Sequence, residues 1–137
     1  MSEIVADLGR PDLCLVALHH DSHEAYLGDI PSPLKRRLRD MGQFDGYTEL
    51  VFSVDRAIGE AFEIQLPMNK SDEDVVKLAD RTAFQMEAKL LLPNEGRAAI
   101  RDDSREILGG LPPCPEPLPP RSAASKFIEI HRSLDIL

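Results

Sequence analysis

The chain has 137 residues, of which 42% are hydrophobic and 29% charged, and this length suits one domain with a single core. Its 24 acidic and 16 basic residues leave a formal net charge of −8, which argues against a protein that holds duplex nucleic acid or an anionic membrane by charge. With 5% aromatic residues and no tryptophan, a stacking platform for single-stranded nucleic acid is also excluded.

The first predicted element is a buried helix of about four turns over Leu13–Leu27. An unbroken apolar run, Leu13–Leu18, follows Pro11 and Asp12, which suit the start of a helix. Strand and helix are both open for the run itself. Helix is favoured because no breaker follows before Gly28. A helix that is apolar all round in its first half is expected to lie in the centre of the fold.

Later segments also carry helical spacing, and none alternates long enough to predict a strand. The predicted helices cover Ser32–Arg39, Tyr47–Phe62, Ser71–Leu92, Arg97–Leu108 and about 122–135. The segment Gly109–Pro120 holds six of the eleven prolines and predicts an extended strap. We therefore predict an all-α fold of five to seven helices in a single domain, 1–137, with its core at about 12–92.

Two cysteines, Cys14 and Cys114, are too few for a disulfide framework, and neither forms a paired metal-binding motif. The sequence carries no signal peptide pattern and no run of about 18 apolar residues. We expect a cytoplasmic protein with reduced thiols and no membrane partner.

A candidate metal site lies near the end of the first predicted helix. With His20 placed at zero on a helical wheel, Glu24 falls near 40° and Asp21 near 100°, beside apolar residues. Buried carboxylates need a partner or a cation, because an isolated buried charge is very costly. Mixed nitrogen and oxygen donors suit a borderline divalent metal.

A third candidate ligand is Asp80, on the predicted helix Ser71–Leu92. The wheel places apolar residues around it, and Glu87 shares its face, so this carboxylate is predicted to face the core. A single cation bound between two buried acids on different helices would offset the cost of burying both carboxylates. The alternative is that Asp80 pairs with a core arginine or caps a neighbouring helix.

The candidate ligands fall in two segments that resemble the HD-domain metal-dependent phosphohydrolases, most closely the short bacterial and phage members akin to 5′-deoxynucleotidases. The first segment is Ala17–Lys35, with its run His-His-Asp-Ser-His-Glu, and the second is Val76–Arg81. The match covers about 12–92. The resemblance implies an HD-domain-like helical bundle, a bound divalent metal (Mn, Co, Fe, Zn or Mg) and hydrolysis of a small phosphomonoester, with a nucleoside 5′-monophosphate as the expected substrate.

The resemblance also implies roles for single residues. His20 and Asp21 match the adjacent ligand pair of the family, and Asp80 matches its distant ligand. Glu24 and Asp29 match acids that act on the attacking water or the leaving group. Beside them, Lys35 or Arg36 could neutralise the charge of the substrate phosphate, and Lys35 is chosen as the expected contact; a solvated basic helix face is the alternative reading.

One departure concerns the first metal-ligand histidine of the family, which lies upstream of the pair. No histidine precedes the His19-His20-Asp21 run. Either the chain begins late or this ligand is lost, and His23 is a better substitute than His19 or His131. The alternative function is a degenerate or truncated bundle without activity that serves as an interaction module.

A homodimer is the expected assembly. Loss of a helix before the His-Asp pair would expose the apolar run Leu13–Leu18, and a large exposed apolar patch favours self-association. A second possible contact is a stripe on the last predicted helix, formed by Phe127, Ile130 and Leu134.

Overall fold

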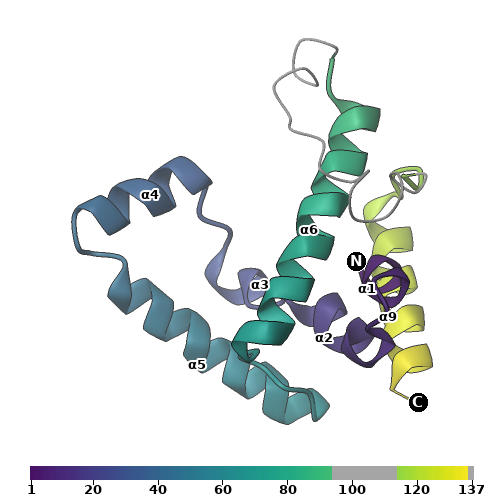
Figure 1. The fold of residues 1–137 in the computed structure, drawn as a ribbon, viewed down its shortest axis with the longest axis horizontal. Helices are drawn as coiled ribbons and strands as arrows, with labels where there is room; N and C mark the ends of the chain where they lie inside the picture. The colour runs from purple at the N-terminus through teal and green to yellow at the C-terminus, as the bar shows by residue number, and fades with distance from the viewer. Residues whose placement is uncertain (94–113, 136–137) are drawn as a thin grey trace. The chain divides into compact units, whose positions relative to one another are not determined.

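The computed structural model describes residues 1–93 and 114–135, and throughout this part of the chain the regular structure is helical, without strands (Figure 1). The predicted all-α class is confirmed. None of the helices in these two ranges is long and apolar enough to cross a membrane. The predicted helix Arg97–Leu108 and the first part of the proline-rich strap fall outside the described residues, and 114–119 contains neither helix nor strand.

The chain divides into two compact units. Unit 1 comprises Met1–Leu18 and Lys70–Leu137, and unit 2 comprises His19–Asn69. The expected single domain stays a prediction.

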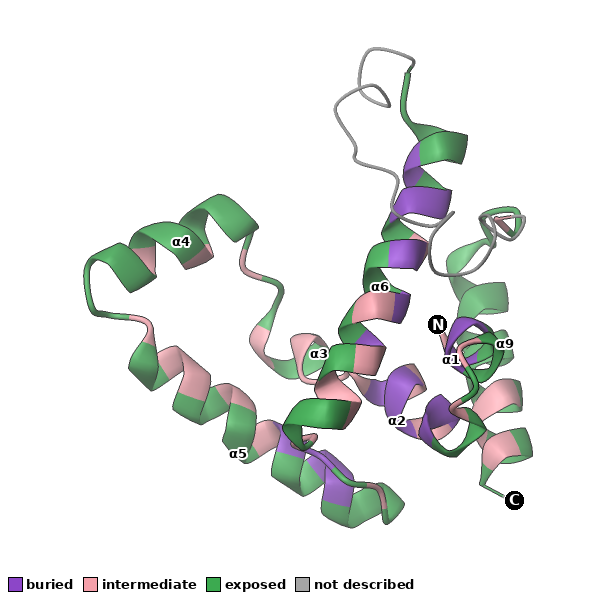
Figure 2. Ribbon diagram, viewed as in Figure 1, coloured by how far each residue is buried: buried purple, intermediate pink, exposed green. Residues whose placement is uncertain are grey.

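Unit 1 is built around a long helix that carries one buried side. Its elements are α1 (Ser2–Asp7), η1 (Pro11–Leu13), most of α2 (Cys14–His19), α6 (Lys70–Leu91) and α9 (Pro120–Leu134). The short α1 packs against both η1 and α6. Figure 2 shows buried residues along one side of α6, where Val76, Ala79 and Met86 recur at helical spacing. These residues belong to the same core as Ile4 and Val5 of α1.

The helix α1 corrects the expected exposure of the apolar run Leu13–Leu18. Leu13 and Ala17 are buried, and so are Cys14 and Val16. The buried position predicted for the first half of the helix is confirmed for these residues. The exposure expected after loss of an upstream helix does not occur, because α1 supplies Ile4 and Val5 to this core. A helix of six residues is too short for a periodicity argument to find.

The buried side of α6 also corrects the predicted position of Asp80. Asp80 is exposed, and Phe84, expected beside it in the core, is 55% exposed. The residue that faces the core is Ala79, and its successor in a helix is turned by about 100°. The prediction chose the wrong apolar neighbours, because Phe84 and Leu91 lie on the solvent side of this helix.

The predicted helix Leu13–Leu27 is not continuous. It is replaced by η1, by α2, which ends at His19, and by a separate short α3 (Glu24–Leu27). Between the last two, the amide of Ser22 donates to the carbonyl of His19 and that of Glu24 to Asp21, three residues back in each case. The Ser22 hydroxyl also bonds His19 Nδ1 at 3.0 Å. Such local side-chain bonds compete with helix continuation.

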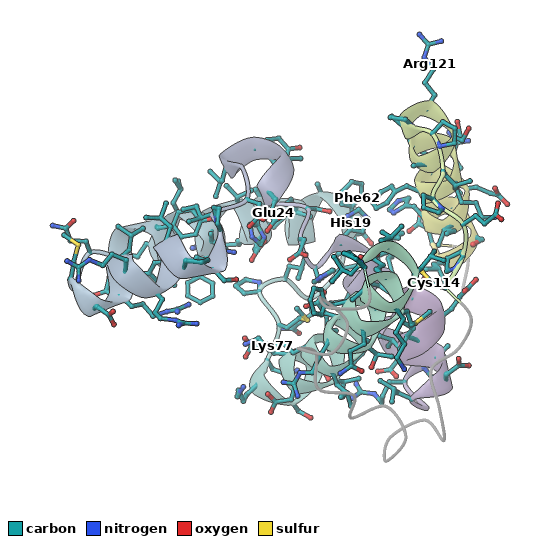
Figure 3. The ribbon with its side chains drawn as sticks, turned by 90° about the horizontal axis from the view of Figure 1, so that it is seen from above. His19, Glu24, Phe62, Lys77, Cys114 and Arg121 are labelled. Atoms are coloured by element: carbon teal, nitrogen blue, oxygen red, sulfur yellow. The ribbon has the colours of Figure 1, made fainter. Side chains whose placement is uncertain are left out.

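Unit 2 holds α3, α4 (Ser32–Asp40) and α5 (Asp45–Phe62). The predicted helices Ser32–Arg39 and Tyr47–Phe62 are confirmed to within two residues at each end. Gly28, with φ of 75°, follows α3 at a position that favours glycine. The buried ring of His19 stacks on Phe62 at the end of α5, with 4.6 Å between ring centroids (Figure 3).

The predicted helices Ser71–Leu92 and 122–135 are likewise confirmed, as α6 and α9. On α9, Phe127 is 38% exposed, while Ile130 and Leu134 are half-buried. The expected homodimer stays a prediction.

The end of α5 depends on a close approach of the chain to Gly59. After Phe62 the backbone turns through Glu63, which has φ of 53°, and the amide of Ile64 then donates to the carbonyl of Gly59. A Cβ atom at Gly59 would lie 2.8 Å from the carbonyl oxygens of both Ile64 and Leu66. Real Cβ atoms do not approach that closely, so only glycine fits here.

We expect Gly59→Ala to lower the free energy of unfolding by about 1–3 kcal/mol, because the backbone of 64–66 must move away. Gly46→Ala, in the same helix, is the matched control, since nothing lies within 4 Å of its Cβ position. This control should keep or raise stability, by up to about 1 kcal/mol. Urea denaturation measures both, and equal effects would contradict the close-approach argument.

Candidate metal centre

The predicted site residues fall in both units. Unit 2 carries His20 and Asp21 in the turn after α2, Glu24 at the start of α3, and Asp29 and Lys35 beyond it. Asp80 lies on α6 in unit 1. A ligand role for Asp80 stays a prediction.

The predicted ligand pair is close together in the turn. His20 Nε2 and Asp21 Oδ2 lie 2.8 Å apart, with the His20 side chain 18% exposed and that of Asp21 53% exposed. The His20 ring lowers the pKa of Asp21 below its usual value, against a smaller opposing effect of burial. Asp21 is therefore held in the ionised form that a metal ion requires.

A second imidazole in the same turn has a buried carboxylate as its partner. His23 Nδ1 lies 3.0 Å from Asp55 Oδ1, and the two side chains are 13% and 12% exposed. Burial raises the pKa of Asp55, while His23 acts in the opposite direction. The contact ties the turn to the middle of α5, and each partner reduces the cost of burying the other's polar group.

Asp55 was not among the predicted site residues, although the sequence contains a signal for it. It lies four residues after Val51 and three before Ile58, so it falls on the apolar face of α5. A carboxylate on such a face needs a partner. Finding that partner requires the turn to be known, because His23 is 32 residues away in the chain.

Three donor residues meet in this turn. Asp21, His23 and Glu24 each offer a ligand atom, and these atoms lie within 4.8 Å of one another. The predicted meeting of Asp21 and Glu24 occurs, but through consecutive tight turns and not on one face of a helix. Burial raises the pKa of Glu24 (Figure 3), as do the nearby negative charges of Asp21 and Asp29.

Asp29 and Lys35 form an ion pair at the edge of unit 2. Asp29 Oδ1 and Lys35 Nζ are 3.3 Å apart, with side chains 63% and 28% exposed. The positive charge of Lys35 also favours the ionised forms of Asp21 and Glu24. Both residues are thus within electrostatic reach of the turn, and their predicted roles in the reaction stay predictions.

In comparisons with known proteins, no family model, no curated protein and no solved structure matches this chain. The resemblance to HD-domain phosphohydrolases rests on its two sequence segments.

We expect Glu24→Gln to raise the melting temperature at pH 7, measured in the presence of a chelator. Because the folded chain raises the pKa of Glu24, the stability that its protonated form contributes is lost as the pH rises above the ordinary value of 4.5. The difference from wild type should therefore shrink toward pH 4. Glu60→Gln, at an exposed position of α5, is the control. A pH-independent difference for Glu24→Gln would contradict this reading.

Proposed function

We propose that the protein is a metal-dependent phosphohydrolase that acts on a small phosphomonoester, with nucleoside 5′-monophosphates as the substrate class. The observation that carries this proposal is the close pair of His20 Nε2 and Asp21 Oδ2, with Glu24 three residues further on. The sequence resemblance supplies the reaction class, and the geometry of unit 2 supports it.

The donor set of the pair fits a divalent metal. Two ligand atoms that share one ion at about 2.1 Å, at right angles, lie about 3 Å apart, and the pair is separated by 2.8 Å. One imidazole nitrogen and one carboxylate oxygen suit Mn²⁺, Co²⁺, Fe²⁺ or Zn²⁺ better than Ca²⁺. We propose His20 and Asp21 as ligands; a third ligand role for Asp80 stays a prediction from the sequence resemblance.

A bound divalent cation would supply a water of lowered pKa and a Lewis acid for the phosphoryl oxygen. Glu24 would orient that water and accept its proton, a role for which its raised pKa brings the carboxylate closer to the working pH. Lys35 would offset the charge of the phosphate. Asp29, the anionic partner of Lys35, would first take up a proton from water when the phosphate displaces it and would then pass that proton to the departing sugar oxygen. In the free protein Lys35 pairs with Asp29, so substrate binding exchanges one anionic partner for another.

Phosphate release tests the proposal. We expect purified protein with Mn²⁺ or Co²⁺ to release phosphate from some members of a nucleoside 5′-monophosphate panel. Asp21→Ala should lower kcat/KM by more than about 100-fold, since loss of an outer-shell partner alone costs about 10–100-fold. Asp40→Ala, an exposed aspartate at the end of α4, is the matched control and should retain full activity.

Equal rates for Asp21→Ala and wild type would reject the proposed centre. No release from any substrate, with the metal bound, would reject the hydrolase and favour the alternative of an interaction module without activity.

A further inference from the structure

We propose that unit 2 contains a divalent-cation site of its own, formed by His23, Asp21 and Glu24 and held in place by Asp55. The site would need no residue of α6. This ligand set shares Asp21 with the set proposed above, and in it Glu24 binds the cation instead of acting on its water. The inference rests on the proposed function for the reaction that the cation would serve, but not for the binding of the cation.

The three donors are placed by the main chain of one short segment. The amide of Glu24 donates to the carbonyl of Asp21 at 2.9 Å, and the amide of Tyr26 donates to that of His23 at 3.0 Å. Their ligand atoms already lie within 4.8 Å of one another. A site whose donors are ordered before binding has a lower entropic cost of capture.

Asp55 performs the part that an outer-shell carboxylate has in many metal sites. A histidine that ligates a metal through one ring nitrogen usually donates its other N–H to a carboxylate, which fixes the tautomer and the ring orientation. His23 has that partner, because its Nδ1 lies 3.0 Å from Asp55 Oδ1. The tautomer with its proton on Nδ1 leaves Nε2 to bind the cation.

The burial of this pair separates it from an ordinary surface cluster. Both side chains are nearly nine-tenths buried, and Asp55 belongs to α5, outside the turn that carries the donors. The imidazole is thereby held by a different element of unit 2. Asp21 is more open, with its side chain 53% exposed, and it provides the side from which an ion would enter.

Charge also favours a cation here. The turn and its surroundings bring together four carboxylates, those of Asp21, Glu24, Asp29 and Asp55. The positive charge of Lys35 lies nearby and pairs with Asp29. Like charges at this range repel, and a divalent cation offsets that repulsion. Because one donor is an imidazole, we expect Zn²⁺, Mn²⁺ or Co²⁺ to bind better than Ca²⁺ or Mg²⁺.

Calorimetric titration of the full chain with Zn²⁺ tests the site. We expect one ion per chain, a loss of at least about 100-fold in affinity for His23→Gln and a loss of about 10–100-fold for Asp55→Asn. His131→Gln, on α9, is the matched histidine control and should bind as wild type does. Thermal melts in a chelator show whether each variant folds.

Asp80→Asn separates the inference from the proposed function. If Asp80→Asn binds Zn²⁺ more weakly than the wild type while His23→Gln keeps the wild-type affinity, the inference is overturned and the ligand set expected from the resemblance is left standing. Binding that depends on His23, without phosphate release from any substrate, would overturn the proposed function and support the inference. No bound Zn²⁺ or Mn²⁺ in the wild type would overturn both.

A measurement on the wild-type chain covers the case in which a variant does not fold. Long-range ¹H–¹⁵N spectra report the state of each imidazole nitrogen. Addition of Zn²⁺ should shift Nε2 of His23 while Nδ1 keeps its proton, and His131 should be unchanged. An unchanged His23 ring at saturating Zn²⁺ would overturn the inference.

Discussion

The candidate centre of unit 2 depends on the buried contact between His23 and Asp55. A carboxylate on the apolar face of α5 would be costly to bury alone, and the imidazole from the turn offsets that cost. The same contact determines where the turn lies against α5. Asp21 and Glu24 are bonded to each other through their backbones within that turn, so their positions follow from it.

This constraint also gives a reason for the break in the predicted first helix. A continuous helix would spread five consecutive residues, from His20 to Glu24, over more than one turn of its circumference. The observed tight hydrogen bonds gather their polar side chains at one place and leave His19 to stack on Phe62. The interruption costs helical hydrogen bonds, and the Ser22 hydroxyl and the His23–Asp55 contact compensate for part of that loss.

Local patterns in the sequence were sufficient for the all-α class and for α4, α5, α6 and α9, because apolar spacing and proline positions act over a few residues. They were insufficient where a contact across the chain decides the outcome. Burial of Leu13 depends on α1, and exposure of Asp80 depends on which side of α6 meets that core. The composition of the candidate site was partly predictable, since Asp21 and Glu24 meet, whereas Asp55 enters it only through tertiary structure.

The imidazoles of His20 and His23, which lie on either side of Asp21 in the sequence, have different partners and would therefore contribute differently to a metal site. His20 lies against Asp21 Oδ2, and that contact already lowers the pKa of the carboxylate without any ion. His23 has its Nδ1 engaged by Asp55, which prepares its other nitrogen for a ligand. A cation that bound His23 and the other carboxylate oxygen of Asp21 would leave the contact between His20 and Oδ2 in place. The turn can therefore keep its internal bonds on binding, which favours a site formed by unit 2 itself.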